Sequence, residues 1–284
     1  MKVVVTGGSG RVGRFTVEEL IEGGHTVCSL DWKRSEALPG ECMQIQADLG
    51  DVGEVYDGMA RFRPEAVCHI AANPSPSDAS RQGTFANNVL STYNVFQAAG
   101  DFGVHRLIYA GSEMATGWLT TEELPPRFPF TEEDRTDSPN AYALSKYLGE
   151  VIADSMVARH PDMAVCTLRI NNVIMPDWYH LLEERRSNFM KKGDANFWSY
   201  IDVRDAASAF RAALEGASDG HEVFLVAAAD NCLDIPLPEA VKRRYGKEGT
   251  FAAGFQPHQS AFDSSKFAHW FGWKPRYSWR KTDA

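Results

Sequence analysis

A tyrosine and a lysine, four residues apart, form the pair in this sequence best suited to move a proton. Tyr142 and Lys146 lie in the segment 140–146 (NAYALSK), and on a helix this spacing puts both side chains on one face. An ordinary phenol, with a pKa of about 10, is a poor proton acceptor at neutral pH. A neighbouring ammonium favours the phenolate, and lowering its pKa by ~3 units corresponds to ~4 kcal/mol. Tyr142 is therefore a candidate base, although the same spacing also occurs on solvated helix surfaces.

A serine ends a short apolar segment that is expected to form a buried strand. Ser112 closes the segment 109–112 (YAGS). In parallel sheets, ligands bind at the carboxyl ends of the strands. A hydroxyl at this position can hold a substrate oxygen beside the phenol. We therefore predict that Ser112, Tyr142 and Lys146 are the catalytic residues.

Three glycines at three-residue intervals follow the first apolar run of the chain. They are Gly7, Gly10 and Gly13, with Arg11 and Val12 between the last two. Small residues let the backbone approach a pyrophosphate, whose charge then lies at the positive end of the following helix. The pattern predicts a dinucleotide site. The alternative is a tight strand-to-helix turn that binds nothing.

An acidic residue ends the second predicted strand. Asp31 stands where a carboxylate can accept hydrogen bonds from both hydroxyls of an adenosine ribose. A carboxylate there would repel the 2′-phosphate of NADP, so the position favours NAD. Lys33 and Arg34 follow closely, and their charges would permit NADP instead.

The elements that must position these residues alternate between short apolar runs and longer amphipathic segments. The predicted strands are Val3–Val5, His25–Leu30, Gln44–Gln46, Ala66–Ile70, Leu107–Ala110 and Val165–Ile170. The segments between them are predicted as helices, among them Arg11–Gly23, Ala86–Ala99 and Ala141–Arg159. This alternation is typical of βαβ units, so we predict an α/β fold with a Rossmann-type, doubly wound parallel sheet.

The periodicity weakens beyond residue 170, where the predicted elements become shorter. We expect residues 1–172 to form an NAD-binding Rossmann domain that carries the catalytic residues. Residues 173–284 are expected to form a small C-terminal substrate-binding lobe. Within them, residues 197–226, which include a predicted helix at Val203–Glu215, return to the main domain.

Composition argues against several classes of binding partner. The 284 residues carry a formal net charge of −9, from 38 acidic and 29 basic side chains, which argues against nucleic-acid and anionic-membrane partners. The aromatic, basic end of the chain (residues 270–281) permits a base-stacking surface, but we favour packing within the small lobe. No signal peptide or membrane-spanning stretch is found, and we expect a cytoplasmic protein.

Cysteine and histidine spacing predicts neither disulfides nor a metal site. The cysteines are five in number and widely scattered, without a C-x-x-C pair: Cys28, Cys42, Cys68, Cys166 and Cys232. The eight histidines show no paired metal-binding spacing. We expect the strand cysteines to behave as small apolar residues in a reducing compartment.

Taken together, the glycine turn, Ser112, Tyr142 and Lys146 resemble the short-chain dehydrogenases/reductases. The order of the motifs is most similar to the extended subgroup, the NAD-dependent epimerase/dehydratase family. The resemblance is strong over residues 1–176 and looser over 200–214 and 262–279. It implies a hydride exchange with nicotinamide in which Tyr142 takes a hydroxyl proton and Lys146 also holds the nicotinamide ribose.

The resemblance implies further cofactor contacts after the third and fourth strands. Asp48 and Leu49 match the family's adenine-contacting pair. The segment Ile70, Ala71 and Ala72 matches the stretch that passes under the cofactor, and Asn88 matches an asparagine on the helix near it.

Departures from the family pattern narrow the substrate. Dehydratases follow the catalytic Ser/Thr with an Asp-Glu pair, whereas Ser112 is followed here by Glu113 and Met114, which disfavours a 4,6-dehydratase. Asn172 stands at the family's usual asparagine, and Glu113 and Asn172 are candidate substrate contacts. The segment 173–199 that follows Asn172 is short for an anchor that grips a nucleotide diphosphate, so we predict a small substrate.

Basic side chains lie within that short segment. Arg185 and Arg186, together with Lys191 and Lys192, are candidates to recognise a carboxylate or a phosphate. The alternative is a solvated, charged helix face.

Three functions follow from these expectations. The first is an NAD-dependent oxidoreductase that acts on a sugar, a sugar acid or a similar small hydroxy or keto compound. The alternative is an NAD-dependent sugar or nucleotide-sugar epimerase, and the third is an NAD-binding regulator without turnover, which the intact Ser112, Tyr142 and Lys146 set disfavours. Helices Ala86–Ala99 and Ala141–Arg159 resemble the pair that forms the family's four-helix dimer interface, so we expect a homodimer.

Overall fold

The chain forms two compact units, each made of segments that are separated in the sequence. The computed structural model describes residues 1–74, 81–137, 139–190, 196–216 and 218–281. Unit 1 comprises Met1–Gly111, Asn140–Leu168 and Ala207–Val223, and unit 2 comprises Ser112–Pro139, Arg169–Ala206 and Phe224–Ala284. The segment Ser112–Pro139 therefore belongs to the same unit as the C-terminal segments.

A seven-stranded sheet forms the centre of the fold. Its order is β3-β2-β1-β4-β5-β6-β9, and the pairs from β3 to β6 are parallel. The strands are β1 (Lys2–Thr6), β2 (Thr26–Asp31), β3 (Met43–Gln46), β4 (Ala66–His69), β5 (Arg106–Ala110), β6 (Ala164–Ile170) and β9 (His221–Val226). The predicted Rossmann-type sheet is confirmed, and β9 adds an edge strand that the sequence analysis does not identify.

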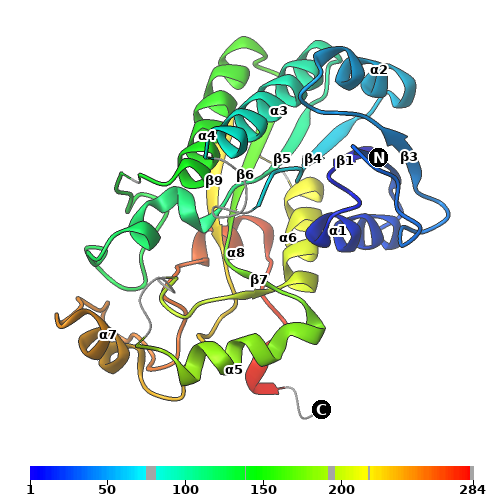
Figure 1. Cartoon of the computed structure of the whole chain (residues 1–284). Helices are drawn as coiled ribbons and strands as arrows, with labels where there is room; N and C mark the ends of the chain where they lie inside the picture. The colour runs from blue at the N-terminus through cyan, green and yellow to red at the C-terminus, as the bar shows by residue number, and fades with distance from the viewer. Residues whose placement is uncertain (75–80, 138, 191–195, 217, 282–284) are drawn as a thin grey trace. The chain divides into compact units, whose positions relative to one another are not determined.

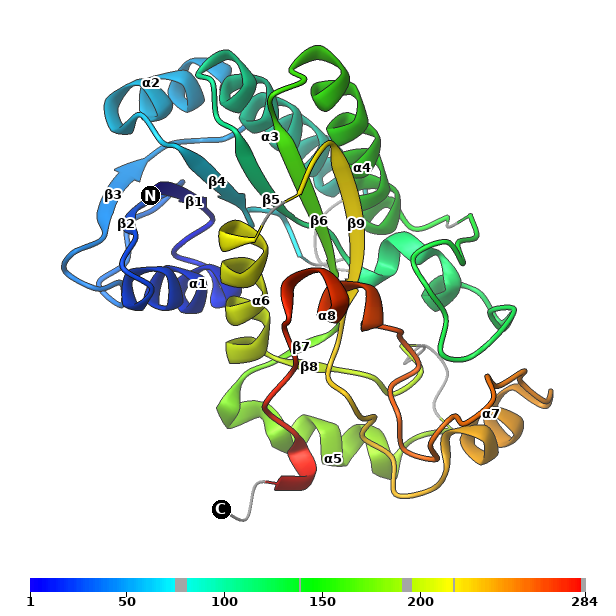
Figure 2. The ribbon, with the colours of Figure 1, turned by 180° about the vertical axis from the view of Figure 1, so that it is seen from behind.

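Helices cover both faces of this sheet. Figures 1 and 2 show α2, α3 and α4 on one face and α1 and α6 on the other. Their bounds are α1 (Arg11–Glu22), α2 (Val52–Phe62), α3 (Arg81–Asp101), α4 (Ala141–Arg159) and α6 (Val203–Glu215). α4 and α6 have the predicted bounds. α3 begins at Arg81, earlier than predicted. The predicted start is too late because Gly83, a poor helix former, weakens the helical pattern of the sequence in the first turn.

The strand order reverses between β1 and β4. From β1 the chain proceeds outward through β2 and β3, then crosses to β4 and proceeds outward on the other side. In open α/β sheets, ligands bind beyond the carboxyl ends of the strands at this reversal. We therefore expect the cofactor at the loops that follow β1 and β4.

Valine-rich strands and an aromatic group fill the core of unit 1. Val3, Val4 and Val5 of β1 are almost fully buried, as expected for a central strand that is covered on both faces. The imidazole of His69 stacks on Tyr109 at 5.7 Å between ring centroids and contacts the Phe96 ring edge-on at 5.8 Å.

Unit 2 consists of short elements around a second apolar core. They are the helices α5 (Tyr179–Ser187), α7 (Leu237–Tyr245) and α8 (Ser265–Phe271), the paired strands β7 (Val173–Ile174) and β8 (Ile201–Asp202), and four 3₁₀ turns, Glu113–Thr116, Trp118–Thr120, Pro176–Trp178 and Trp279–Lys281. Five phenylalanine rings, at 128, 130, 197, 251 and 262, contact one another in its core. No helix within the described ranges is long and apolar enough to cross a membrane.

The aromatic, basic C-terminal segment packs within unit 2. The backbone N–H of Trp279 donates to the hydroxyl of Tyr200 at 2.9 Å, and its indole N–H donates to the carbonyl of Asn231 at 3.0 Å. Arg204 is held by Asp202 and lies 3.5 Å from the centroid of the Tyr277 ring. These contacts agree with the packing role that we favoured for this segment.

Candidate active site

The glycine turn after β1 has a backbone conformation and a close packing that residues with side chains cannot reproduce. Gly7 has a φ of +71°, in the left-handed region, and its carbonyl accepts from the Gly10 N–H at 2.9 Å. A Cβ on Gly13 would lie 2.0 Å from the Gly7 carbonyl oxygen. The turn leads into the twelve-residue helix α1, whose N-cap is Gly10 and which has no side-chain cap. Glycines at a helix N-terminus fit the pyrophosphate of a dinucleotide.

Asp31 contacts the glycine turn from the end of β2. Its carboxylate accepts from the Ser9 backbone N–H at 2.9 Å, and its side chain is buried. The Ser9 hydroxyl in turn donates to the carbonyl of Lys33 at 2.9 Å. The Lys33 ammonium lies over the exposed Trp32 ring, 5.5 Å from its centroid.

The loop after β4 packs against the same turn. The Thr6 hydroxyl accepts from the backbone N–H groups of Ile70 and Ala71 at 3.1 and 3.3 Å, and a Cβ on Gly7 would lie 2.7 Å from the Ala71 Cα. Ala72 is the next residue of this loop. The structure thus brings the predicted residues of the first and fourth strand ends together.

Asp48 and Leu49 lie in the turn between β3 and α2. The Asp48 carboxylate accepts from the Gly50 N–H at 2.8 Å, which shapes the turn. The Leu49 carbonyl accepts from the Asn94 amide of α3 at 3.0 Å.

Asn88 connects three parts of unit 1. Its amide exchanges hydrogen bonds with the backbone of Asn73, at 2.7 and 3.2 Å, and donates to the Ser145 hydroxyl at 3.2 Å. Ser145 donates to the carbonyl of Tyr142 at 2.7 Å. Asn88 therefore ties the loop after β4 to the first turns of α4.

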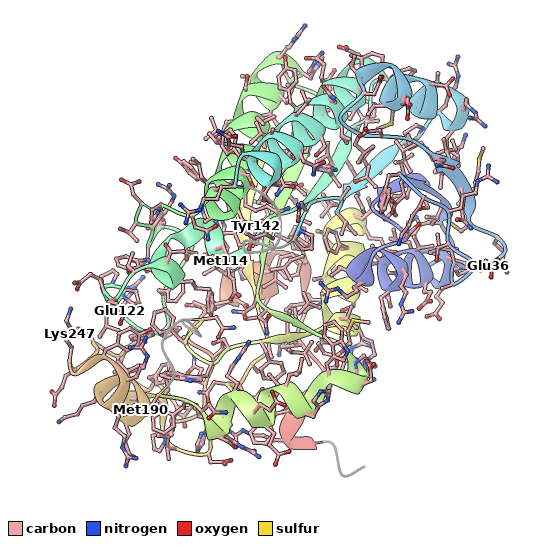
Figure 3. All side chains as sticks on the ribbon, in the orientation of Figure 1. Glu36, Met114, Glu122, Tyr142, Met190 and Lys247 are labelled. Carbon is pink, nitrogen blue, oxygen red and sulfur yellow. The ribbon has the colours of Figure 1, made fainter. Side chains whose placement is uncertain are left out.

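Tyr142 and Lys146 lie on α4, one helical turn apart, as predicted. Asn140 caps this helix by accepting from the Ala143 N–H at 3.0 Å, and Figure 3 labels Tyr142 close to that end of α4. The Lys146 ammonium donates to the carbonyl of Ala110 at 2.7 Å and lies 5.9 Å from the centroid of the Tyr142 ring.

Lys146 is buried, which changes its protonation. Burial lowers the pKa of its side chain from the usual 10.5 to about 7. Near neutral pH, the ammonium and amine forms therefore coexist. The Lys146 ammonium also lies over the Tyr109 ring, 5.0 Å from its centroid, and no sequence motif signals this contact.

Ser112 and Glu113 begin unit 2. The Ser112 hydroxyl accepts from the Met114 N–H at 3.2 Å and caps the 3₁₀ turn Glu113–Thr116. Glu113 is 6% exposed, and burial raises the pKa of its carboxyl to about 8, although Arg185 opposes this shift. An uncharged carboxyl thus follows the predicted catalytic serine at neutral pH.

The two adjacent arginines of α5 have different partners. Arg185 donates to the side-chain oxygen of Asn196 at 3.4 Å. When the side-chain amide of Asn172 is oriented with its oxygen toward Arg185, that oxygen also accepts from the guanidinium, at 3.1 and 3.2 Å. Arg186 instead pairs with Asp234 at 3.1 Å and stacks on Trp279 at 4.6 Å. The structure thus brings Glu113, Asn172 and Arg185 together, and places Arg186 elsewhere.

Asn196 is a functional candidate that no sequence motif signals. It is buried and reaches Arg185 from the far end of a segment whose residues 191–195, including the candidates Lys191 and Lys192, lie outside the described residues. In the part of the chain that the structure covers, no group of three His, Cys, Asp or Glu side chains is placed to hold a metal. All five cysteines are buried and have free thiols.

Comparison with protein families agrees with this geometry. Residues 3–227 match the family described as "NAD dependent epimerase/dehydratase family". The chain belongs to this family. The resemblance inferred from the motifs is confirmed, and so is the prediction of NAD as the cofactor, since the family is NAD dependent.

Members of the epimerase/dehydratase family with related sequences include epimerases and dehydrogenases. The chain is 26% identical to a UDP-glucose 4-epimerase of Corynebacterium glutamicum, over 98% of this chain and 92% of that protein. It is 28% identical to an NAD-dependent glucose-6-phosphate dehydrogenase of Haloferax volcanii, over 80% of this chain and 86% of that protein. A solved UDP-glucose 4-epimerase of Thermotoga maritima shares the fold, with a TM-score of 0.75, 22% identity, and coverage of 98% of this chain and 94% of that one.

Proposed function

We propose that this family member transfers hydride between NAD and a hydroxyl-bearing carbon of a sugar, a sugar acid or a similar small hydroxy or keto compound, with net oxidation or reduction. The observation that carries the proposal is the pairing of Tyr142 with the buried Lys146, one helical turn apart on a capped helix. A phenol beside a buried amine is a proton carrier, and an NAD-binding regulator without turnover has no need of one.

Each residue then has a defined task. Bound NAD supplies the hydride acceptor or donor. The Tyr142 phenol takes the proton of the substrate hydroxyl or returns it to a carbonyl oxygen. Ser112 donates a hydrogen bond to that oxygen, since its own hydroxyl already accepts from the Met114 N–H. Lys146 favours the ionised form of Tyr142 while it is itself protonated.

A dehydrogenase is favoured over an epimerase by the charges of unit 2. Gripping a nucleotide diphosphate requires several cationic groups. Arg186, Arg204 and Arg280 are each paired with an aspartate of the same unit, and the segment 173–199 is short. The Haloferax volcanii relative, described as a dehydrogenase, supports a small sugar substrate with a single anionic group.

An NAD-dependent sugar or nucleotide-sugar epimerase is the second candidate, and the relatives that align over nearly the whole of this chain favour it. The Corynebacterium glutamicum relative, which aligns over nearly the whole of this chain, is described as an epimerase. An epimerase uses the same Tyr142, Lys146 and Ser112, but it keeps its cofactor bound and returns the hydride to the same sugar.

The experiment is a screen of sugars, sugar acids and ketones for a net change in reduced nicotinamide. We expect stoichiometric NADH formation with one class, and a Tyr142→Phe variant whose kcat is lower by about 10²–10⁴ while its Kd for NAD is nearly unchanged. Tyr56→Phe on α2, whose hydroxyl donates to Asp101 at the surface, is the matched control and should keep full activity. Normal turnover in Tyr142→Phe would refute the mechanism. Interconversion of two epimers without net NADH, by protein that retains NAD through purification, would establish the epimerase instead.

A further inference from the structure

Among the described residues, the guanidinium of Arg185 on α5 has neutral hydrogen-bond acceptors only. Arg185 and Arg186 are adjacent in the sequence, but Arg186 pairs with two carboxylates, Asp234 at 3.1 Å and Glu183 at 3.5 Å. The hydrogen bonds of Arg185 go to the amide oxygens of Asn172 and Asn196, and to the backbone carbonyl of Ser199 at 3.5 Å. These bonds orient its positive charge without neutralising it.

Glu113 is the carboxyl on which the charge of Arg185 acts, and one of its oxygens lacks a hydrogen bond. Its Oε2 atom is buried and has no hydrogen-bond partner. Arg185 is the charged group that acts on it, with the Asn172 backbone and the Asn196 side chain as polar neighbours. Because burial keeps this carboxyl largely protonated at neutral pH, it does not cancel the charge of Arg185 and is able to donate a hydrogen bond.

The backbone that carries Asn196 is strained. Phe197 and Trp198 have φ values of 49° and 56°, in the left-handed region that residues with bulky side chains avoid. Both side chains are buried in the apolar core of unit 2, which maintains this conformation. The strained turn lies between Asn196 and Ser199, so it places both of their oxygens on the Arg185 guanidinium. Strain of this kind is typical of binding sites.

We propose that Arg185, together with Glu113 and Asn172, binds a single anionic group of the substrate, a carboxylate or a phosphate monoester on a sugar. This assignment rests on the proposed function, because Glu113 directly follows Ser112, the residue expected to hold the reacting oxygen. A guanidinium binds both groups in the same bidentate manner. The neutral carboxyl adds a hydrogen-bond donor, and the amides of Asn172 and Asn196 keep the guanidinium in place.

The test compares anionic sugars with their neutral counterparts. D-Glucuronate, D-galacturonate and D-glucose 6-phosphate are assayed against D-glucose and D-galactose. We expect kcat/KM to be about 10- to 100-fold higher for an anionic sugar, which is the range that one charged hydrogen-bonded contact supplies. Preference for the uronates would identify a carboxylate site, and preference for the sugar phosphate would identify a phosphate site. Equal or better use of the neutral sugars would overturn the proposal while leaving the proposed function intact.

Adjacent arginines provide the matched variants. Arg185→Gln should raise KM for the anionic sugar about 10- to 100-fold, and this loss should be at least about tenfold larger than any loss with the neutral sugars. Arg186→Gln should stay within about threefold of the parent. Similar losses in both variants, or equal losses for anionic and neutral sugars, would contradict the assignment.

A pH profile distinguishes Glu113 from a merely structural residue. In the parent, KM for the anionic sugar should rise as the pH passes about 8, because ionised Glu113 then repels the anion and neutralises Arg185. Glu113→Gln should remove this rise, and a rise that persists in this variant would contradict the role of Glu113.

Binding measurements keep the proposal testable if no sugar is turned over. Calorimetric titration of the NAD-loaded protein with D-glucuronate and with D-glucose 6-phosphate should show binding that Arg185→Gln abolishes. Failure of the turnover screen alone would count against the proposed function. Absence of binding of either anion would overturn the present inference.

Discussion

A lysine whose side chain is excluded from water lies beside Tyr142, the residue that we propose as the proton carrier. The ammonium form of Lys146 is favoured by the Ala110 carbonyl and disfavoured by burial, and the pKa falls to about 7. The supply of ammonium beside Tyr142 is therefore sensitive to pH close to neutrality. A solvated lysine would remain charged up to about pH 10 and would show no such dependence.

Burial of Lys146 should make the folded state less stable at low pH. The unfolded chain binds a proton at this site up to about pH 10, whereas the folded chain releases it near pH 7. The cost is therefore fully present below pH 7 and is relieved as the pH rises toward 10. Lys146→Met should raise the free energy of unfolding at pH 6 by roughly 1–3 kcal/mol, with a gain that shrinks toward pH 10. Denaturant unfolding without added nucleotide measures this; a gain independent of pH would contradict it.

Asp31 should determine the choice between NAD and NADP. Its carboxylate is fixed by the Ser9 N–H beside the glycine turn, where the ribose of the cofactor is expected. The parent should bind NAD more tightly than NADP, and Asp31→Ser should narrow the ratio of the two dissociation constants at least about tenfold. Glu36→Gln, an exposed acid in the loop after β2, is the control and should leave the ratio unchanged (Figure 3). Tighter NADP binding by the parent would mean that Lys33 and Arg34 dominate.

At the scale of elements, the position of α4 on the sheet depends on one glycine. A Cβ on Gly149 would lie 2.3 Å from the hydroxyl oxygen and 2.5 Å from Cζ of Tyr109, which belongs to β5. A residue with any side chain would push α4 away from β5. Because α4 carries Tyr142 and Lys146, that movement would also disturb the predicted site.

Gly149→Ala should therefore lower both stability and activity. Overpacking of this kind costs about 1–3 kcal/mol, partly offset by about 1 kcal/mol from the better helix propensity of alanine. Tyr109→Phe in the same chain removes the closest atom and should recover part of the loss. Gly40→Ala is the control, since no atom lies within 4 Å of its added Cβ, and it should change the free energy of unfolding by less than about 0.5 kcal/mol. Equal effects of Gly149→Ala and Gly40→Ala would refute the close packing.

At the scale of the whole molecule, α3 and α4 present large apolar side chains to solvent. Leu90 and Tyr93 of α3 are 49% and 45% exposed, and Leu144 and Val151 of α4 are 40% and 42% exposed. The two helices lie side by side in both views of the ribbon (Figures 1 and 2). We propose that a second copy of the chain covers this face, as the resemblance to the family's four-helix interface implies.

A charge on this face should dissociate the dimer. In a two-fold symmetric interface, Val151→Arg places one unpaired positive charge on each subunit. Burying these charges should raise the dissociation constant of the dimer at least about 100-fold. Sedimentation of the parent and the variant measures the effect. Leu181→Arg on α5, whose leucine is 38% exposed in unit 2, should leave the dimer intact. A monomeric parent would refute the proposed interface.

The local features of this protein follow from its sequence because they depend on neighbours along the chain. The glycine turn is predicted because only glycine permits the left-handed φ of Gly7 and the close approach of Gly13. α4 is predicted with its bounds because the helical pattern runs between Pro139 and Pro161, and the structure adds that Asn140 caps its first turn. The order of the motifs along the chain was sufficient to predict both the fold and the family.

Features that depend on distant partners were decided by the tertiary structure. Helical periodicity does not distinguish Arg185 from Arg186, because the carboxylate that pairs with Arg186 is Asp234, 48 residues away along the chain. It also does not signal Asn196, which reaches Arg185 only through the left-handed turn at Phe197 and Trp198. The low pKa of Lys146 and the high pKa of Glu113 have the same origin: burial depends on which segments the fold brings around a residue, and no local pattern contains that information.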